Sequence, residues 1–348
     1  MIEITTTRHN PLVDPVLHVW GWEIPVYLFV GGLVAGMMIL AGFNMLRAAR
    51  GEDTRRFFSL QTPLLGFMLL NLGMLALFLD LAHKLYVFRV YMAFEPLSPM
   101  SWGSWILLLV YPVLLVSALI RLDQAWPWLG AQVPQLRRIS DGMLAHPGLL
   151  RALAGINIVL GVGLGIYTGI LLNTMVARPL WNSAILGPLF LFSGLSAAAA
   201  MVHLASAVFP GRPAPKGLIG GALASMVLTL GPAYPEKGTV NQVIRVDLVF
   251  LTIELVLIGL LLIGLVTSTE SHIAAARLLT TGQFAPVFWG GVVGAGILLP
   301  LVWQWLELNH WIPHTVIPAV LVLAGGFALR WVMVNAGQYS TFVQTAGF

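Results

Sequence analysis

Cysteine is absent from this chain of 348 residues. Iron–sulfur clusters are held by cysteine thiolates, and thiolates are also the usual ligands of soft metal ions. The chain therefore holds no iron–sulfur cluster and no thiolate-ligated metal ion. Any electron chemistry must use a diffusible carrier or a redox group on another chain.

Charged residues are also scarce. They make up 9% of the chain, against about 25% in soluble domains. Hydrophobic residues reach 58%, and the mean hydropathy is +0.87. A soluble fold of this size does not hide so much apolar surface, so the sequence predicts a protein embedded in the lipid bilayer. The pI of 9.6 does not indicate nucleic acid, because the basic residues lie at the ends of apolar runs rather than in one patch.

Continuous apolar runs of membrane-spanning length recur along the chain. A hydrocarbon core of about 30 Å needs about 20 apolar residues in a helix, and alternating patterns typical of strand barrels are not seen. The N-terminal segment MIEITTTRHNPLVDPVLHVW lacks the pattern of a signal peptide, so the first span is expected to remain in the mature protein. We predict an all-α integral membrane protein, a single domain over residues 1–348, with about nine spans at 24–46, 58–82, 102–121, 150–172, 184–209, 217–232, 246–267, 286–306 and 315–335.

The distribution of Lys and Arg predicts the orientation of these spans. Eleven of the 18 basic residues lie in the connections after the first, third, fifth and seventh spans, and six lie on the other side. The prediction is an N-terminus outside and a C-terminus inside. Small residues at helix-contact spacing, such as Gly32 and Gly36 or Gly161 and Gly165, indicate tight packing of these helices.

Ionisable residues near the predicted span ends are candidates for function, because they are expensive in a bilayer. Asp80 and His83 are three residues apart and are predicted to share a helix face, where they can pass a proton. Alternatively, Asp80 only pairs with Lys84 or Arg89. Glu23 begins the first span, where it can also serve merely to complement the helix dipole.

Deeper polar residues are candidates for a proton path. Asp247 can pair with Arg245, and the predicted topology places both near the outer face. Glu254 lies two turns deeper than Asp247 on the same helix face. His203 lies well inside a span, and no second deep histidine is present to complete a haem ligand pair. Glu307, His310 and His314 sit in the segment WLELNHWIPH, where interface exposure is favoured over a metal site.

Several segments resemble the NrfD/PsrC family of membrane subunits. They are WGWEIPVYLFVGGLVAG, LDLAHKLYVFRVYMAFEPLSPMSWGSW, GIYTGILLNTMVARPLWNSAILGPLFLFSGLSAAAA and LRWVMVNAGQYS. The resemblance implies a multi-pass subunit of a bacterial cytoplasmic membrane. Such a subunit exchanges electrons between the menaquinone or ubiquinone pool and a ferredoxin-like iron–sulfur subunit. It further implies a catalytic partner carrying molybdopterin, a hydrogenase or a multihaem cytochrome, and no haem, iron–sulfur cluster or metal on this chain.

The resemblance also assigns residues to a quinone site near the outer face. Glu23, Asp80 and His83 are the expected proton-handling groups. A quinone ring is expected between Tyr27, Tyr86 and Trp102, with further contacts from Ser101, Tyr167, Arg178, Trp181 and Asn182. Some relatives place a histidine in the first helix where this chain has Val26 and Tyr27. Asp247, Glu254 and His203 are candidates to extend a proton path toward the cytoplasm, which the sequence does not establish.

Two other functions fit parts of the pattern. Buried acids and Gly/Pro-interrupted helices are also features of secondary transporters, although no internal repeat is evident here. A membrane anchor without chemistry of its own is the third alternative. Quinone binding and a cysteine-rich partner discriminate among the three.

Overall fold

The computed structural model describes residues 20–52, 57–92, 94–125, 132–208 and 237–342, and every regular element in these ranges is a helix. Eight of the helical segments are long and apolar enough to cross a membrane. They coincide with eight of the predicted spans, so the predicted class, an all-α polytopic membrane protein, is confirmed. The predicted span at 217–232 lies outside the described residues.

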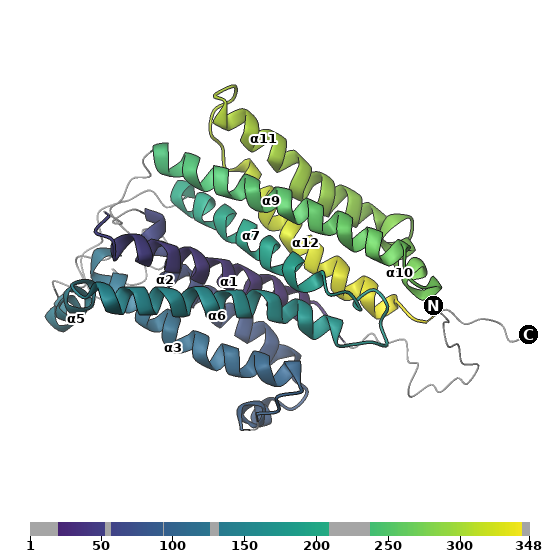
Figure 1. Ribbon diagram of the computed structural model, residues 1–348, viewed down its shortest axis with the longest axis horizontal. Coiled ribbons are helices and arrows are strands. Elements are labelled where there is room, and N and C mark those ends of the chain that lie inside the picture. The colour runs from purple at the N-terminus through teal and green to yellow at the C-terminus, as the bar shows by residue number, and fades with distance from the viewer. Residues whose placement is uncertain (1–19, 53–56, 93, 126–131, 209–236, 343–348) are drawn as a thin grey trace, which may run out of the picture.

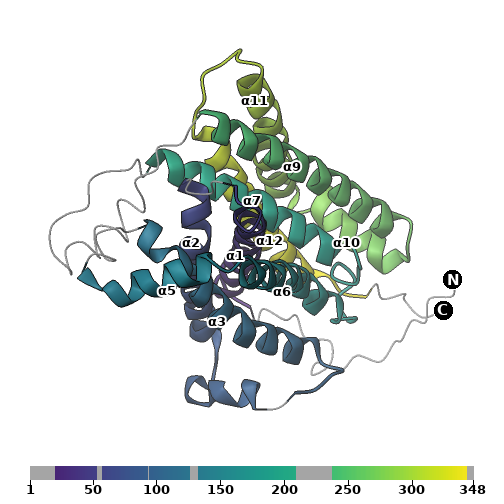
Figure 2. The same cartoon turned by 60° about the vertical axis from the view of Figure 1, so that its left-hand side comes forward.

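The helices form two groups that lie side by side (Figures 1 and 2). The N-terminal half contains α1 (Glu23–Ala48), α2 (Phe57–Asp80), the short 3₁₀ helix η1 (Lys84–Tyr91), α3 (Pro99–Ala125), α5 (Pro134–Leu144) and α6 (Pro147–Asn173). The C-terminal half contains α7 (Leu186–Val208), α9 (Lys237–Val266), α10 (Glu270–Thr280), η2 (Pro286–Leu298), α11 (Leu299–Leu308) and α12 (Ile317–Tyr339).

Proline marks where several of these helices begin. It occupies the first turn of α5, α6 and η2, a position where its missing N–H breaks no helical hydrogen bond. η2 has the wider π-helical turn and runs directly into α11, so the two form one span, Pro286–Leu308. The sequence GGVVGAG in η2 allows a close approach to α12, where the backbones of Gly296 and Gly325 meet.

Small residues also form the seam between the two halves. The backbone of Gly194 in α7 lies against that of Gly32 in α1, and a side chain at Gly36 would stand 2.6 Å from Cβ of Ala198. On the other side of α1, Gly161 of α6 packs against the backbone of Ala35. The predicted role of these glycines in helix packing is thus seen in the structure. α1 becomes the central helix, enclosed by α2, α6, α7 and α12.

The first and last described helices meet at one end of the bundle. The backbone N–H of Trp20 donates to Oε1 of Gln338 at 3.0 Å, and Nε2 of Gln338 donates to the backbone carbonyl of Trp20 at 3.1 Å. We call this end the Glu23 face and the opposite end the Arg47 face. The predicted topology put the start of the first span and the end of the last at opposite faces, and in this respect it is wrong.

The second half of the chain explains this difference. α7 and α9 run antiparallel, because Ser196 lies beside Asp247 and Ser193 lies beside Glu254. α7 therefore ends, and α9 begins, toward the Arg47 face. The expected placement of Arg245 and Asp247 near the Glu23 cluster is consequently also wrong, since Asp247 lies in the C-terminal half, at the level of the middle of α7.

Candidate functional site

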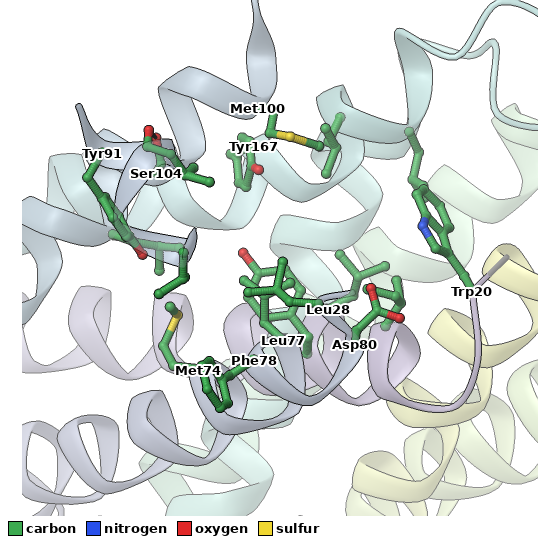
Figure 3. A pocket seen from close by; sticks show the side chains of 18 residues that line it. Trp20, Leu28, Met74, Leu77, Phe78, Asp80, Tyr91, Met100, Ser104 and Tyr167 are labelled. Carbon is green, nitrogen blue, oxygen red and sulfur yellow. Dashed lines mark hydrogen bonds between the residues drawn. The ribbon is translucent and has the colours of Figure 1, made fainter. Parts of the chain in front are cut away.

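A cavity of about 380 Å³ opens in the N-terminal half near the Glu23 face. Its walls come from α1, α2, η1, α3 and α6, with Trp20 at one end, and they are mostly apolar (Figure 3). Besides Trp20, the lining residues with polar side chains are Tyr27, Asp80, Tyr91, Ser104 and Tyr167. This volume and this lining are typical of a site for a small organic ligand.

Asp80 is the acid of the cavity. It is the last residue of α2, and its carboxylate lies on the same side of the space as Leu28 in Figure 3. Glu23 at the start of α1 is close enough to interact with it electrostatically. α2 ends at Asp80, so the predicted sharing of a helix face with His83 is wrong. His83 precedes η1, is exposed, and packs edge-on against Tyr86 with ring centroids 6.4 Å apart.

Three tyrosines bring hydroxyl groups to the cavity. Tyr27 and Tyr167 are buried, as members of α1 and α6, and Tyr91 ends η1. Burial raises the pKa of Tyr91 from its ordinary value of 10.0, which keeps this hydroxyl protonated and able to donate. Gly103 in the SPMSWG segment is in direct contact with the Tyr167 ring, so a side chain there would displace the ring.

The other predicted ring-binding residues lie elsewhere. Tyr86 is 53% exposed and stacks under Arg89 at 4.5 Å, while Trp102 is 41% exposed and donates its indole N–H to the Pro96 carbonyl. Ser101 accepts a hydrogen bond from the Glu95 N–H at 3.0 Å, which fixes the turn before α3. The expectation that Tyr27, Tyr86 and Trp102 enclose one ring is therefore corrected: of the three, only Tyr27 lines the cavity.

Arg178, Trp181 and Asn182 belong to a connection between the halves rather than to the cavity wall. Nη1 of Arg178 donates to the carbonyls of Gln338 and Ser340, both at 3.1 Å, and burial lowers the pKa of Arg178. The Trp181 indole donates to the Met333 carbonyl at 2.7 Å and stacks on Trp20. Asn182 is exposed, and its backbone N–H closes the turn on Arg178. The RPLWN segment thus holds the end of α12 beside the cavity.

A second group of polar residues is buried in the C-terminal half. The Asp247 carboxylate accepts hydrogen bonds from Ser196 Oγ at 2.9 Å and from Gln304 Nε2 at 2.6 Å, which joins α9 to α7 and α11. Its exposed fraction is 2%. The predicted alternative, pairing with Arg245, is not what the structure shows for this carboxylate.

Glu254 continues this group two turns along α9. It is hydrogen-bonded by Ser193 and interacts with Arg330, a fully buried cation on α12. Arg330 also donates to Ser193 Oγ and, at 2.8 Å, to the Phe190 carbonyl. A buried carboxylate beside a buried guanidinium satisfies the requirement that charges inside a bilayer find partners.

His203 lies on α7 toward the Arg47 face, close enough to Glu307 and His314 for electrostatic interaction. The expected exposure of the WLELNHWIPH segment is wrong for Glu307, whose side chain is fully buried. His310 is exposed. Within the described residues, no group of three His, Asp or Glu side chains is arranged to hold a metal ion.

Sequence reasoning missed several residues of both groups. Tyr91 and Ser104 line the cavity, but they carry no charge and lie in segments where other aromatic residues are more conspicuous. Ser193, Ser196 and Gln304 are uncharged, and their importance appears only through the acids that they contact. For Arg330 the available signal is a lone cation in the middle of a span.

Fold and site together define a polytopic membrane protein with an apolar cavity at one end. The chain matches the family described as "Polysulphide reductase, NrfD" over residues 7–342, and it belongs to this family. A polysulfide reductase chain of Wolinella succinogenes is 32% identical, covering 93% of this chain and 95% of the relative. Protein NrfD of Escherichia coli K12 is 27% identical, covering 92% of this chain and 95% of the relative. A selenate reductase subunit of Mesobacillus selenatarsenatis is 25% identical, covering 90% of this chain and 73% of the relative.

Proposed function

We propose that this chain is the quinone-reactive membrane subunit of a respiratory oxidoreductase, exchanging electrons between a menaquinone or ubiquinone pool and an iron–sulfur partner subunit. The observation that carries the proposal is the apolar cavity, which joins three tyrosine hydroxyls and one carboxylate near a membrane face. Two relatives are named as a chain and as a subunit of reductases. These names support a role within a larger complex.

The cavity residues fit a quinone headgroup. A quinone carries two electrons and two protons between redox partners. Tyr27, Tyr91 and Tyr167 offer hydroxyl donors for its oxygens, while Leu28, Leu107 and other apolar side chains enclose the ring and the start of the isoprenoid tail. Asp80 lines the cavity with Glu23 near it, and its proposed role is to accept or return a proton there. His83, three residues further on and exposed, is the proposed exchange point with water.

The basic residues support an orientation for this site. Positive charge is enriched on the cytoplasmic side of membrane proteins. Eight described basic residues lie at or near the Arg47 face, and four lie at the Glu23 face. The eight are Arg47, Arg50, Arg121, Arg137, Arg138, Arg151, Lys237 and Arg245; the four are Lys84, Arg89, Arg178 and Arg277. We therefore propose that the cavity lies at the outer face of a bacterial inner membrane.

The partner subunit is proposed to dock over the connection between α2 and α3. Large apolar side chains are strongly exposed there, including Leu85 at 88%, Met92 at 76% and Leu97 at 90%. Apolar patches of this kind mark contact surfaces. A ferredoxin-like subunit at this place brings a cluster close to Tyr91 and Asp80. The catalytic subunit beyond it is of the molybdopterin, hydrogenase or multihaem cytochrome class.

Buried acids in the C-terminal half support a further element of the proposal, a proton path that extends to the Arg47 face. Asp247 and Glu254 follow one another along α9, and His203 lies between them and the Arg47 face.

The test is purification of the complex from native membranes, followed by addition of quinol. A co-purifying iron–sulfur subunit whose absorption bleaches with quinol is expected. Asp80→Asn combined with Glu23→Gln is expected to slow this bleaching by about 100-fold or more. Glu270→Gln, an exposed acid of the same face that lies outside the proposed docking surface, is the control. Unchanged bleaching in the double variant overturns the site, and a complex that assembles but ignores quinol supports the anchor alternative.

A further inference from the structure

Glu307 is a buried acid at the edge of the membrane-spanning region. It is the penultimate residue of α11, yet its side chain is 0% exposed. Oε1 accepts hydrogen bonds from the Thr315 N–H at 2.9 Å and from the Thr315 hydroxyl at 3.0 Å. Oε2 accepts no hydrogen bond from the described residues. It lies 3.6 Å from Nδ1 of His314, whose side chain is 31% exposed.

One oxygen of Glu307 is therefore structural, and the other faces a group that reaches water. The backbone and hydroxyl of Thr315 fully occupy Oε1, a task that an amide oxygen performs equally well. A carboxylic acid adds an ionisable oxygen, which is costly to bury without a purpose. The titratable groups facing it are His203 from α7 and His314 from the α11–α12 connection, with Asp247 from α9 lying beyond Gln304.

Gln304 connects Glu307 to the deeper acids. It lies three residues earlier on the same face of α11, and its Nε2 donates to Asp247 at 2.6 Å. From Asp247 the polar side chains continue through Ser196 and then through Glu254, Ser193 and Arg330. A side chain at Gly32 would lie 3.1 Å from Nη2 of Arg330. Gly32 is about one helical turn from Leu28, a wall residue of the cavity.

We propose that Glu307 and His314 form the proton port of this chain at the Arg47 face, with Gln304 as a positioning residue. The inference rests on the proposed function, because it assigns the aqueous end of that proton path. His314 takes a proton from water and passes it from Nδ1 to Oε2 of Glu307. A water molecule hydrogen-bonded to the Gln304 amide then carries one proton on to the Asp247 carboxylate.

Two substitutions of Glu307 separate a proton role from a structural one. Glu307→Gln keeps the size of the side chain and an oxygen for Thr315 but has no ionisable proton. Glu307→Asp keeps the ionisable group but is one methylene shorter and reaches Thr315 less well. A proton port predicts that the Asp variant retains more proton transfer than the Gln variant. A purely structural acceptor predicts the opposite order.

The experiment uses the whole complex in liposomes, with a pH-sensitive dye trapped inside. An acceptor that cannot cross the membrane is added outside, so that only complexes with the partner subunit outward turn over and the Arg47 face meets the dye. Quinol-dependent electron transfer is recorded in the same vesicles with an uncoupler present. Glu52→Gln, an exposed acid at the Arg47 face that pairs with Arg47, is the matched control. His310→Asn controls for His314→Gln.

The expected result is a quinol-dependent pH change in the wild type and the two controls. Glu307→Gln should reduce its initial rate by about tenfold or more, and His314→Gln should reduce it less. Electron transfer with uncoupler should remain in both variants. A normal dye signal in Glu307→Gln overturns the proposed proton port. Wild-type electron transfer with no pH change inside the liposomes overturns it as well. Absence of electron transfer from quinol in the wild type overturns the proposed function itself, and the port with it.

Discussion

In the N-terminal half of the bundle, Tyr27, Tyr91 and Asp80 face an open space, whereas in the C-terminal half Asp247, Ser196 and Gln304 face one another. The first arrangement leaves hydrogen-bonding capacity for a ligand. The second uses most of that capacity inside the protein, where it holds three helices together around one carboxylate. Polar residues inside a membrane thus have two different uses in one chain, and burial alone does not tell them apart.

The largest effect is expected from Arg330→Met in the C-terminal half. The change removes the hydrogen bonds to Ser193 and Phe190 and leaves Glu254 as a buried acid without its cation. Loss of one partner of a buried pair typically costs about 3–5 kcal/mol. Thermal unfolding of the purified complex in detergent measures the loss. The double variant Arg330→Met with Glu254→Gln should recover part of it, and equal stability of the two variants would show that the pair is not coupled.

A smaller loss of stability is expected at the seam between the halves. Gly194→Ala places a methyl group against the backbone of Gly32, whose carbonyl carbon would lie 2.8 Å away. Overpacking of this kind typically costs about 1–3 kcal/mol. Gly31→Ala is the matched control on α1, since nothing lies within 4 Å of a side chain there. The yield of assembled complex and its thermal midpoint measure the difference. Similar values for both variants would contradict the claim that the contact between Gly194 and Gly32 needs glycine.

The cavity itself is tested by filling it. Met100→Trp enlarges a side chain on the cavity wall without altering any polar group there. Quinone affinity is expected to fall about tenfold, which corresponds to about 1.4 kcal/mol. Leu109→Trp enlarges a side chain of the same helix, α3, that is 51% exposed and lies outside the wall, so this variant should bind quinone normally. Quinone titration of the purified complex decides, and equal affinity in both variants would place the ligand elsewhere.

The smallest effect is expected from Tyr91→Phe, which removes one hydroxyl donor from the cavity. One neutral hydrogen bond contributes about 0.5–1.5 kcal/mol, so quinone should bind a few-fold more weakly. Because burial raises the pKa of Tyr91 above 10.0, the hydroxyl keeps its proton as the pH rises toward that value. The difference between wild type and variant should therefore be constant from about pH 7 to about pH 9. A difference that vanishes at alkaline pH would argue against this donor.

The residues that the sequence indicated most strongly were the ones that an apolar setting makes conspicuous. Glu23, Asp80, Asp247 and Glu254 all stood out as ionisable groups at or within spans, and the structure places each beside another polar group. The sequence did not show whether Asp80 and Asp247 belong to one cluster. Their separation follows from the direction of α9, which runs antiparallel to α7. The sequence prediction, with its span at 217–232, gave α9 the opposite direction.

Aromatic residues were harder to assign from the sequence. Tyr86 and Tyr91 both follow the end of α2, five residues apart, and nothing in their local sequence says which one faces the cavity. The 3₁₀ turns of η1 decide this, because they direct Tyr91 and Val87 inward and leave Tyr86 exposed under Arg89. Similarly, the conspicuous RPLWN segment suggested ligand contacts, but its Arg178 and Trp181 hold the end of α12.

The sequence by itself determined that this protein crosses a membrane as helices, because apolar runs of sufficient length leave the backbone no other way to satisfy its hydrogen bonds. It also determined that no cysteine-held metal centre resides on the chain. Only the tertiary structure decided which polar groups meet. Which groups meet depends on the direction of each helix and on the close helix contacts that Gly32, Gly161 and Gly194 permit. It also depends on where each helix begins and ends relative to its neighbours.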